Sequence, residues 1–343
     1  MEKQTAKVTA KMSKKQNPVA EMIVKHPAII TLAFFVVMFI YFACASPVNR
    51  DGISTFLSPA NLINIVEATA GFSIGAFAMT MVLLVGSIDL STDAVISICC
   101  AVFGTCLVTF QMGLLASILI TLAAGAVCGI LNALLVVKFQ VPAFLATIAI
   151  AFAFTGVSYK ITNGTSQLLA SPALTKIFGP YGSGGRFLGL PVILIWTVIL
   201  MAAMYLLISK SKFGRWAQAT GGNKQAAYSS GVNVSMVTTV AFLIMGVFSA
   251  VVGIMFCARM GAYSSSYGVG YGLKFIICAV LGGTSFEGDG GNIFGTLLGS
   301  MVVGVLTNGL GILGVDAYTQ QIILGIVIVL SVVFSIYVAK KRK

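Results

Sequence analysis

Three carboxylates lie in apolar parts of the sequence, at Glu67, Asp89 and Asp93. A carboxylate in such a setting is a functional candidate unless it is paired, solvated or used as a helix cap. Asp89 follows a glycine-serine turn and precedes two hydroxyl residues, so it can accept backbone N–H bonds from a helix that begins at Leu90. We therefore expect a structural role for Asp89, with a role in solute passage or gating as the alternative.

Catalytic chemistry has few candidates in this sequence. It contains no phosphate-binding lysine motif, no nucleophile elbow and no spaced metal-ligand set. The single histidine, His26, borders the first apolar run, and the seven cysteines all lie in apolar segments, where they are expected to pack as small apolar side chains. We expect a chain that is not an enzyme and that does not hydrolyse ATP by itself.

The composition is that of a membrane protein. Of 343 residues, 58% are hydrophobic and 9% are charged, and the mean hydropathy is +1.01. A globular shell cannot hide so much apolar surface, whereas lipid can cover it. The apolar runs are long and unbroken, so they predict helices rather than a β-barrel. The net charge of +12 gathers in the tails and one internal loop, which argues against nucleic acid and agrees with the positive-inside rule for membrane proteins.

The sequence predicts an all-α polytopic protein with about ten transmembrane helices. The eighth is short and flanked by glycine, so we expect it to be broken or re-entrant. The spans run Ala28–Ser46, Leu62–Gly86, Ala94–Phe110, Leu114–Lys138, Ala143–Thr162, Pro191–Ser209, Met236–Arg259, Leu273–Thr284, Ile293–Leu313 and Tyr318–Ala339.

Lysine and arginine concentrate in segments on the same side as the N-terminus, which places both termini in the cytoplasm. The predicted organisation is a basic cytoplasmic tail over 1–27, a single membrane domain over 28–339 and a basic cytoplasmic end over 340–343. Within the domain, 161–190 forms an external loop that either caps an entrance or merely connects two helices, and 210–234 forms a cytoplasmic loop.

Four stretches carry a family pattern. They are Gly86–Ser91 (GSIDLS), Asn132–Val136 with Val141–Thr147, Gly214–Asn223 with Ala226, Ala227 and Ser230–Val234, and Gly282–Ser285 with Gly295–Gly299, Asn308–Leu310 and Gln320–Gln321. Together these stretches resemble the permease family of bacterial ABC importers for ribose, xylose, galactose, autoinducer-2 and related solutes. The resemblance covers the chain from Asn61 to its C-terminus, in family order and spacing.

The resemblance implies a multi-pass protein of the bacterial inner membrane that forms the path of a sugar-like solute. It implies a partner ATP-binding subunit that holds ATP and Mg, with no cofactor in this chain. It also implies a periplasmic or lipid-anchored solute-binding protein, and a second permease copy, identical or not. The alternative is an ion-coupled secondary transporter that uses the intramembrane carboxylates, although such a carrier needs no docking helix in 214–234.

The cytoplasmic loop is the predicted contact with the ATP-binding subunit. A short helix seated in a partner's groove needs glycines where its ends turn, a cap, and small residues that allow close approach. The alternative is a basic membrane anchor with a capped surface helix. The residues concerned are Gly214, Arg215, Gly221, Gly222, Asn223, Ala226, Ala227 and Gly231.

Six residues are candidates to line the solute path or its gate, and packing is the alternative for each: Asp89, Phe144, Tyr271, Lys274, Asn308 and Gln320. The chain departs from the family pattern near this set. Relatives commonly place acidic residues where this chain has Gly272 and Lys274, and glycine where it has Asp93. We expect Lys274 either to extend to the membrane surface or to pair with Asp89 or Asp93.

Overall fold

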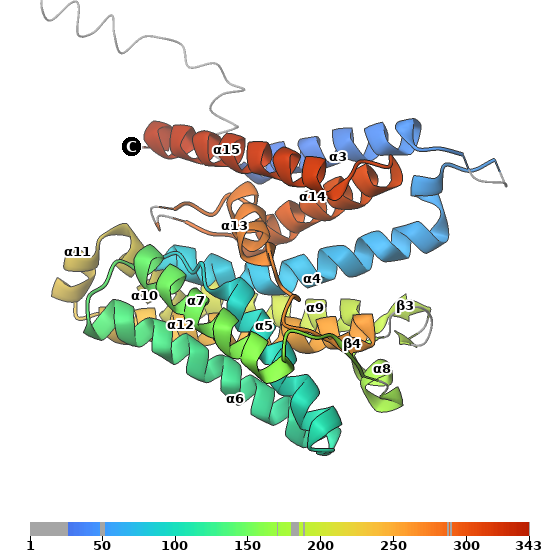
Figure 1. The fold of residues 1–343 in the computed structure, drawn as a ribbon. Coiled ribbons are helices and arrows are strands. Elements are labelled where there is room, and N and C mark those ends of the chain that lie inside the picture. Colours follow the sequence, from blue (N-terminus) through green and yellow to red (C-terminus); the bar gives the residue numbers. More distant parts are fainter. Residues whose placement is uncertain are drawn as a thin grey trace, which may run out of the picture.

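The computed structural model describes residues 27–48, 52–169, 171–179, 185–187, 189–286, 288 and 290–342 (Figure 1). Residues 1–26 of the tail predicted over 1–27, and the last residue of the chain, lie outside the described residues. The helices are α3 Pro27–Ala45, η1 Thr55–Leu57, α4 Pro59–Leu84, α5 Thr92–Gly104, η2 Thr105–Thr109, α6 Leu114–Ala133, η3 Leu134–Lys138, α7 Ala143–Thr162, α8 Pro172–Phe178, α9 Val192–Tyr205, η4 Leu206–Lys210, α10 Lys212–Gly222, α11 Lys224–Ser229, α12 Val234–Met260, α13 Tyr271–Leu281, α14 Ile293–Ile312 and α15 Ala317–Arg342.

The prediction of an all-α polytopic membrane protein is confirmed. Eight helices in the described part of the chain are long and apolar enough to cross a membrane, and α13 and the first part of α15 are shorter apolar helices. α13 has only 11 residues, about half the length needed to cross a bilayer. The predicted short eighth span is thus a helix that begins inside the bundle.

The two ends of the bundle differ in character. One end, here called the basic end, carries α10 and α11 with Lys210, Lys212, Arg215 and Lys224, and α15 ends on this side (Figure 1). The opposite end, here called the loop end, carries α8, the short strands and the connections between α3 and α4 and between α14 and α15.

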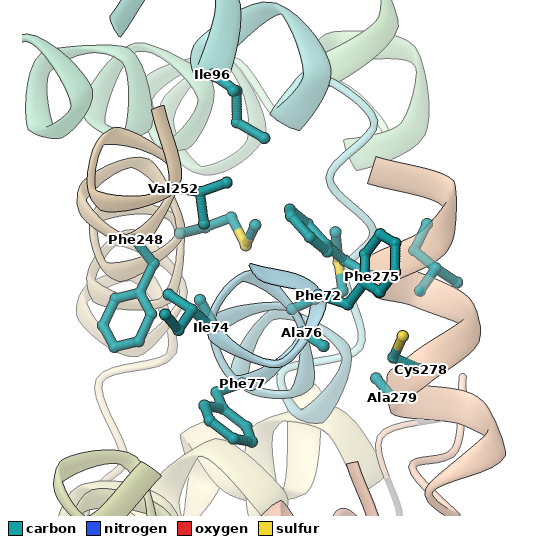
Figure 2. Close-up of a cluster of buried hydrophobic side chains, with 14 of the residues drawn as sticks. Phe72, Ile74, Ala76, Phe77, Ile96, Phe248, Val252, Phe275, Cys278 and Ala279 are labelled. Carbon is teal, nitrogen blue, oxygen red and sulfur yellow. The ribbon is translucent and has the colours of Figure 1, made fainter. Parts of the chain in front are cut away.

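α4 is the central helix. Most of its side chains are buried from Thr69 onward, and it lies between α12 on one side and α13 on the other (Figure 2). Ile74 points toward Phe248 of α12, whereas Phe72 lies toward Phe275 of α13. A Cβ on Gly75 of α4 would collide with the Phe275 ring, so this glycine sets how closely α13 approaches.

The packing repeats itself within the chain. α4 packs against α13 and α14, and α12 packs in the corresponding way against α5 and α6. α4 is followed by an irregular segment over 85–91 and the helix α5, while α12 is followed by an irregular segment over 261–270 and the helix α13. α4 and α12 thus take corresponding places in two halves of the bundle, and internal repeats of this kind occur in many transporters, although no repeat is visible in the sequence.

Small residues set the closest helix contacts. In α6, a Cβ on Gly125 or Gly129 would strike the backbone of Gly246 or Phe242 in α12. Such contacts, in which small residues allow two backbones to approach, are typical of helices packed in lipid.

The predicted external loop is anchored rather than free. β1 (Gln167–Leu168) pairs with β4 (Ala262–Tyr263), and the Tyr263 hydroxyl donates to Gln167 Oε1 at 2.6 Å. β2 (Arg186–Phe187) pairs with β3 (Leu190–Pro191) just before α9. Because β4 directly follows α12, the loop is joined to the start of the irregular segment over 261–270.

Candidate functional site at the basic end and the broken helices

The predicted cytoplasmic loop folds into two consecutive helices, α10 and α11. Ser211 caps α10 by accepting the Gly214 N–H at 3.1 Å, and Asn223 caps α11 by accepting the Ala226 N–H at 2.9 Å. Gly231 has a φ of 82°, which suits glycine, and it lies in the turn that ends α11. The cap and the terminating glycine that the sequence predicted are therefore both present.

One face of α10 is buried and made of small residues. Gly214, Ala217 and Thr220 repeat at helical spacing and are buried. A Cβ on Gly214 would collide with the carbonyl group of Ile208 in η4. α10 therefore packs against the backbone of the bundle in close contact, without side chains between them at Gly214.

Gly221 is the point where three segments meet. Its Cα lies against the Leu84 carbonyl at the end of α4 and against Gly288 in the loop that follows α13. A Cβ on Gly221 would lie 2.8 Å from the Gly288 Cα, and a Cβ on Gly86 would lie 3.4 Å from the Gly221 Cα. A displacement of α10 therefore acts directly on the end of α4 and on the loop between α13 and α14.

The outer face of α10 and α11 is exposed, basic and aromatic. Trp216 and Tyr228 are 40% and 70% exposed, and Arg215 is exposed beside Trp216. Gly222 and Ala226 are also exposed, whereas Ala227 is buried against the bundle. Aromatic and arginine side chains are enriched in protein interfaces, so this face suits a protein partner that carries carboxylates. We call it the docking face.

Two irregular segments interrupt the helices inside the bundle. The segment over 85–91 leads from α4 to α5, and the segment over 261–270 leads from α12 to α13. The second segment lies against the first turns of α5, the helix that follows the first segment, because a Cβ on Gly268 would be 2.8 Å from Ile96 Cβ of α5. Non-helical backbone at membrane depth occurs where protein or a water-filled cavity surrounds it, and in transporters it marks the solute path.

Asp89 lies in the first of these segments and is 2% exposed. Its Oδ1 accepts the Ser91 N–H at 2.8 Å and the Ser91 hydroxyl at 2.6 Å. The helix begins at Thr92 rather than at the predicted Leu90, with Ser91 as N-cap residue, so Asp89 fixes the turn that precedes α5. Asn132 of α6 extends this network, since its Nδ2 donates to the Ser91 hydroxyl at 2.6 Å.

Tyr271 and Lys274 lie together on the first turns of α13. The Lys274 ammonium group is 4.8 Å from the centre of the Tyr271 ring and 5.4 Å from that of Phe72 on α4. Lys274 is only partly exposed, and the two rings hold its charge inside the bundle by cation–π attraction. The sequence offered no sign of Phe72, which lies about 200 positions away in the chain from Lys274.

The remaining path candidates do not join this cluster. Asn308 pairs with Asn61 of α4 near the loop end, and Gln320 donates to the Val315 carbonyl at 2.8 Å in the turn before α15. Phe144 is 49% exposed at the start of α7, near the basic end. The fold thus places the six predicted path residues in different parts of the bundle, and of the six only Tyr271 and Lys274 contact one another.

One further charged pair borders the cluster. Arg259 Nε of α12 lies 3.9 Å from Glu67 Oε2 of α4, and both residues line a cavity of about 20 Å³ with Tyr271. A cavity of that size holds a single water molecule. The partner of Glu67 was not predicted, because the sequence gives no sign that the outer ends of α4 and α12 meet.

Comparison with known proteins identifies the chain's relatives. The family described as "Branched-chain amino acid transport system / permease component" matches residues 61–332. The chain is 36% identical over 278 residues to the ribose import permease protein RbsC of Escherichia coli K12, covering 81% of this chain and 86% of that protein. It is 35% identical over 282 residues to RbsC of Bacillus subtilis, with coverage of 81% and 85%. It is 28% identical over 341 residues to the xylose transport system permease protein XylH of E. coli K12, with coverage of 83% and 86%.

No solved structure matches the chain. The matched range begins at Asn61 near the start of α4 and reaches into α15, so it includes both irregular segments and the docking face. With a family match over most of its length and relatives above 30% identity, the chain belongs to the family of permease components of such transport systems.

Proposed function

We propose that this chain is the transmembrane permease subunit of an ATP-binding-cassette importer for a sugar or sugar-like solute. The relatives named above are import permeases for ribose and xylose, and another relative is a D-allose transport permease. The observation that carries the proposal is the docking face, a basic and aromatic surface on helices whose opposite side contacts the end of α4 and the loop between α13 and α14.

The geometry suits the transmission of force from a partner. The docking face contacts a cytoplasmic ATP-binding subunit, which holds ATP and Mg. When that subunit closes on ATP, it displaces α10, and Gly221 pushes on Leu84 and Gly288. Both irregular segments then move, because the one over 85–91 follows α4, and the one over 261–270 precedes α13, which leads into the loop that holds Gly288. Switching such a two-state equilibrium almost completely takes about 5 kcal/mol.

The loop end receives the solute in this proposal. A periplasmic or lipid-anchored binding protein delivers it to the strands and α8, which are joined to α12 and hence to the segment over 261–270. The protein accordingly lies in the bacterial inner membrane with its basic end in the cytoplasm, as the charge distribution predicts.

A second permease copy completes the path. The outer faces of α7 and α15 are apolar and exposed in the single chain, with Phe152 77% and Tyr318 80% exposed. Because most oligomers are symmetric, we expect two permease copies, identical or similar, to form a pair. Lipid covers the apolar surface that remains outside their contact.

The test is a copurification of the tagged chain with the products of neighbouring genes. We expect an ATP-binding subunit to remain bound, and its ATP hydrolysis to rise when the binding protein and ribose, xylose or allose are added. A branched-chain amino acid is the negative control for solute class. Absence of a bound ATPase, together with solute uptake by the purified chain alone down a proton or sodium gradient, would overturn the proposal.

Two surface variants locate the contact. Arg215→Glu reverses a charge on the docking face and should release the ATP-binding subunit. Lys176→Glu is its matched control, because Lys176 is an exposed cation on α8 at the loop end. Equal loss of the ATPase in both variants would argue against the docking face.

A further inference from the structure

The N-terminus of α13 has no cap of its own. Its N-cap residue is Gly270, which has a φ of 77° and no side chain that can accept a hydrogen bond. The first N–H groups of any helix lack partners within the helix. Inside a membrane protein, a backbone N–H without a partner is costly, so the start of α13 needs an acceptor from elsewhere.

Asp93 of α5 supplies that acceptor. Its Oδ2 accepts the Gly270 N–H at 2.6 Å, and its Oδ1 accepts the Gly272 N–H. Asp93 is also the second residue of α5, so the same carboxylate lies at the N-terminus of its own helix. Two helix N-termini therefore meet at one negative charge, which offsets the partial positive charge of both.

The fit around this carboxylate requires glycine on the opposite side. A Cβ on Gly272 would lie 2.8 Å from Asp93 Oδ1 and 3.0 Å from Thr92 Oγ1. A side chain at position 272 would thus occupy the space that the Asp93 carboxylate fills. Replacement of Asp93 by alanine would free this space for a side chain at position 272, whereas the two side chains cannot share it.

Two charged groups act on Asp93 from neighbouring turns. Lys274 lies one turn along α13 and interacts electrostatically with Asp93. Asp89, in the irregular segment before α5, also interacts electrostatically with Asp93. Lys274 is not within ion-pair distance of Asp93 among the described residues, because its ammonium lies over the rings of Tyr271 and Phe72. The cap formed by Asp93 is therefore made with backbone N–H groups rather than with the lysine.

We propose that Asp93 is a positioning residue that caps α13 from α5, so that these two helices move as one unit during transport. The C-terminal end of α13 leads into the loop that contacts Gly221, so movement of α10 reaches α13 through that loop. The Asp93 hydrogen bonds carry that movement across to α5. The inference rests on the proposed function for its role in transport, but the capping itself does not.

The experiment compares four versions of the assembled transporter: the natural sequence, Asp93→Ala, Gly272→Glu and the double variant Asp93→Ala/Gly272→Glu. The readouts are solute uptake per ATP hydrolysed in proteoliposomes and thermal unfolding of the purified chain. Asp316→Ala is the matched control, because Asp316 caps the start of α15 within its own helix, at 3.0 Å from the Tyr318 and Thr319 N–H groups, and joins no second helix.

We expect uptake per ATP to fall about tenfold in Asp93→Ala, the factor that corresponds to losing one good helix cap. Gly272→Glu alone should be at least as impaired, because two carboxylates then compete for one space. The double variant should return to within about twofold of the natural sequence, since one carboxylate again lies between the helices. Asp316→Ala should lower the unfolding temperature while leaving uptake per ATP unchanged.

Three results would overturn the inference. They are full uptake per ATP in Asp93→Ala, an equal loss in Asp93→Ala and Asp316→Ala, and a double variant that is monodisperse yet not restored. Failure of the proposed function is recognised separately. The natural chain would then show no solute-stimulated hydrolysis, while the unfolding temperatures of the four versions would still report whether Asp93 and Gly272 are coupled.

Discussion

The side-chain amides of Asn61 and Asn308 are hydrogen-bonded to each other in both directions. Asn61 Nδ2 donates to Asn308 Oδ1 at 3.0 Å, and Asn308 Nδ2 donates to Asn61 Oδ1 at 2.8 Å. Asn61 Nδ2 also donates to the Phe56 carbonyl at 2.8 Å. The pair ties α4 to α14 near the loop end, so Asn308 acts in the contact between two helices rather than in an open path.

Replacement of Asn308 should therefore lower stability without changing solute preference. We expect Asn308→Ala to cost about 1 kcal/mol, the usual worth of a polar contact between membrane helices. Unfolding of the purified chain measures the cost, and the rank order of solutes that stimulate hydrolysis measures preference. Asn61→Ala with the double variant completes the cycle, which should show coupling between the two positions. A well-folded Asn308→Ala protein with a new solute preference would instead support Asn308 as a residue that lines the solute path.

Gly221 and Gly222 offer a matched pair of neighbours on α10. A Cβ on Gly221 would collide with the Leu84 carbonyl, whereas a Cβ on Gly222 would meet nothing within 4 Å. We expect Gly221→Ala to shift α10 from its seat and lower uptake per ATP about tenfold or more, at a packing cost of about 1–3 kcal/mol. Gly222→Ala should leave α10 in its place against the bundle, because the added Cβ meets no atom there.

The measurement is uptake per ATP in proteoliposomes, with binding of the ATP-binding subunit checked by copurification. Normal coupling in a folded Gly221→Ala protein would refute the assignment of Gly221 as the point of force transfer.

Asp89 should matter more for folding than for solute choice. Its carboxylate is buried and accepts two hydrogen bonds from Ser91, and removing it leaves the Ser91 N–H without its partner. Asp89→Ala should cost about 1–3 kcal/mol and reduce the yield of monodisperse protein. Glu67→Ala is the comparison, because its carboxylate is partly exposed and its ion pair with Arg259 is long, at 3.9 Å. Equal yields of the two variants would contradict this reading of Asp89.

The cap at Asp316 predicts a dependence of stability on pH. Hydrogen bonds from the Thr319 hydroxyl and N–H, and from the Tyr318 N–H, hold the pKa of Asp316 below its usual value. A depressed folded-state pKa stabilises the protein above the unfolded-state value of about 3.9 and stops doing so as the pH falls through the folded-state value. The gap in unfolding temperature between the natural chain and Asp316→Ala should be constant from pH 7 to about pH 5 and shrink below about pH 4. A gap that widens on acidification would contradict the cap.

The helices could be predicted from the sequence because lipid imposes a strong rule on them. Apolar runs of suitable length gave the spans Leu114–Lys138 and Ala143–Thr162 with the bounds that the structure shows, and glycines flanking the run near Leu273 indicated the short α13. Local signals also sufficed for Asn223 and Gly231, because a cap and a terminating glycine act within one turn of their own helix.

Contacts between distant segments could not be predicted in the same way. Asp93 bonds to Gly270, 177 positions away, and Asn61 bonds to Asn308, 247 positions away. Such partners are set by the packing of the two halves, which leaves no spacing pattern in one sequence. The unusual Asp93 and the unusual Gly272 were each visible as departures from the family pattern, but that they fill one space follows only from the fold.

The burial of α4 has a consequence for how the protein is made. Among the eight long apolar helices of the described chain, α4 has the lowest mean hydropathy and the largest buried share. It carries Asn61, Thr69, Ser73 and Thr80 in buried positions, and the Thr80 hydroxyl pairs with Thr296 of α14 at 2.8 Å. The helix that organises the finished bundle is thus the one least suited to enter lipid alone. We therefore expect α4 to stay in contact with the insertion machinery, or with α3, until α12, α13 and α14 have been synthesised and can cover its polar groups.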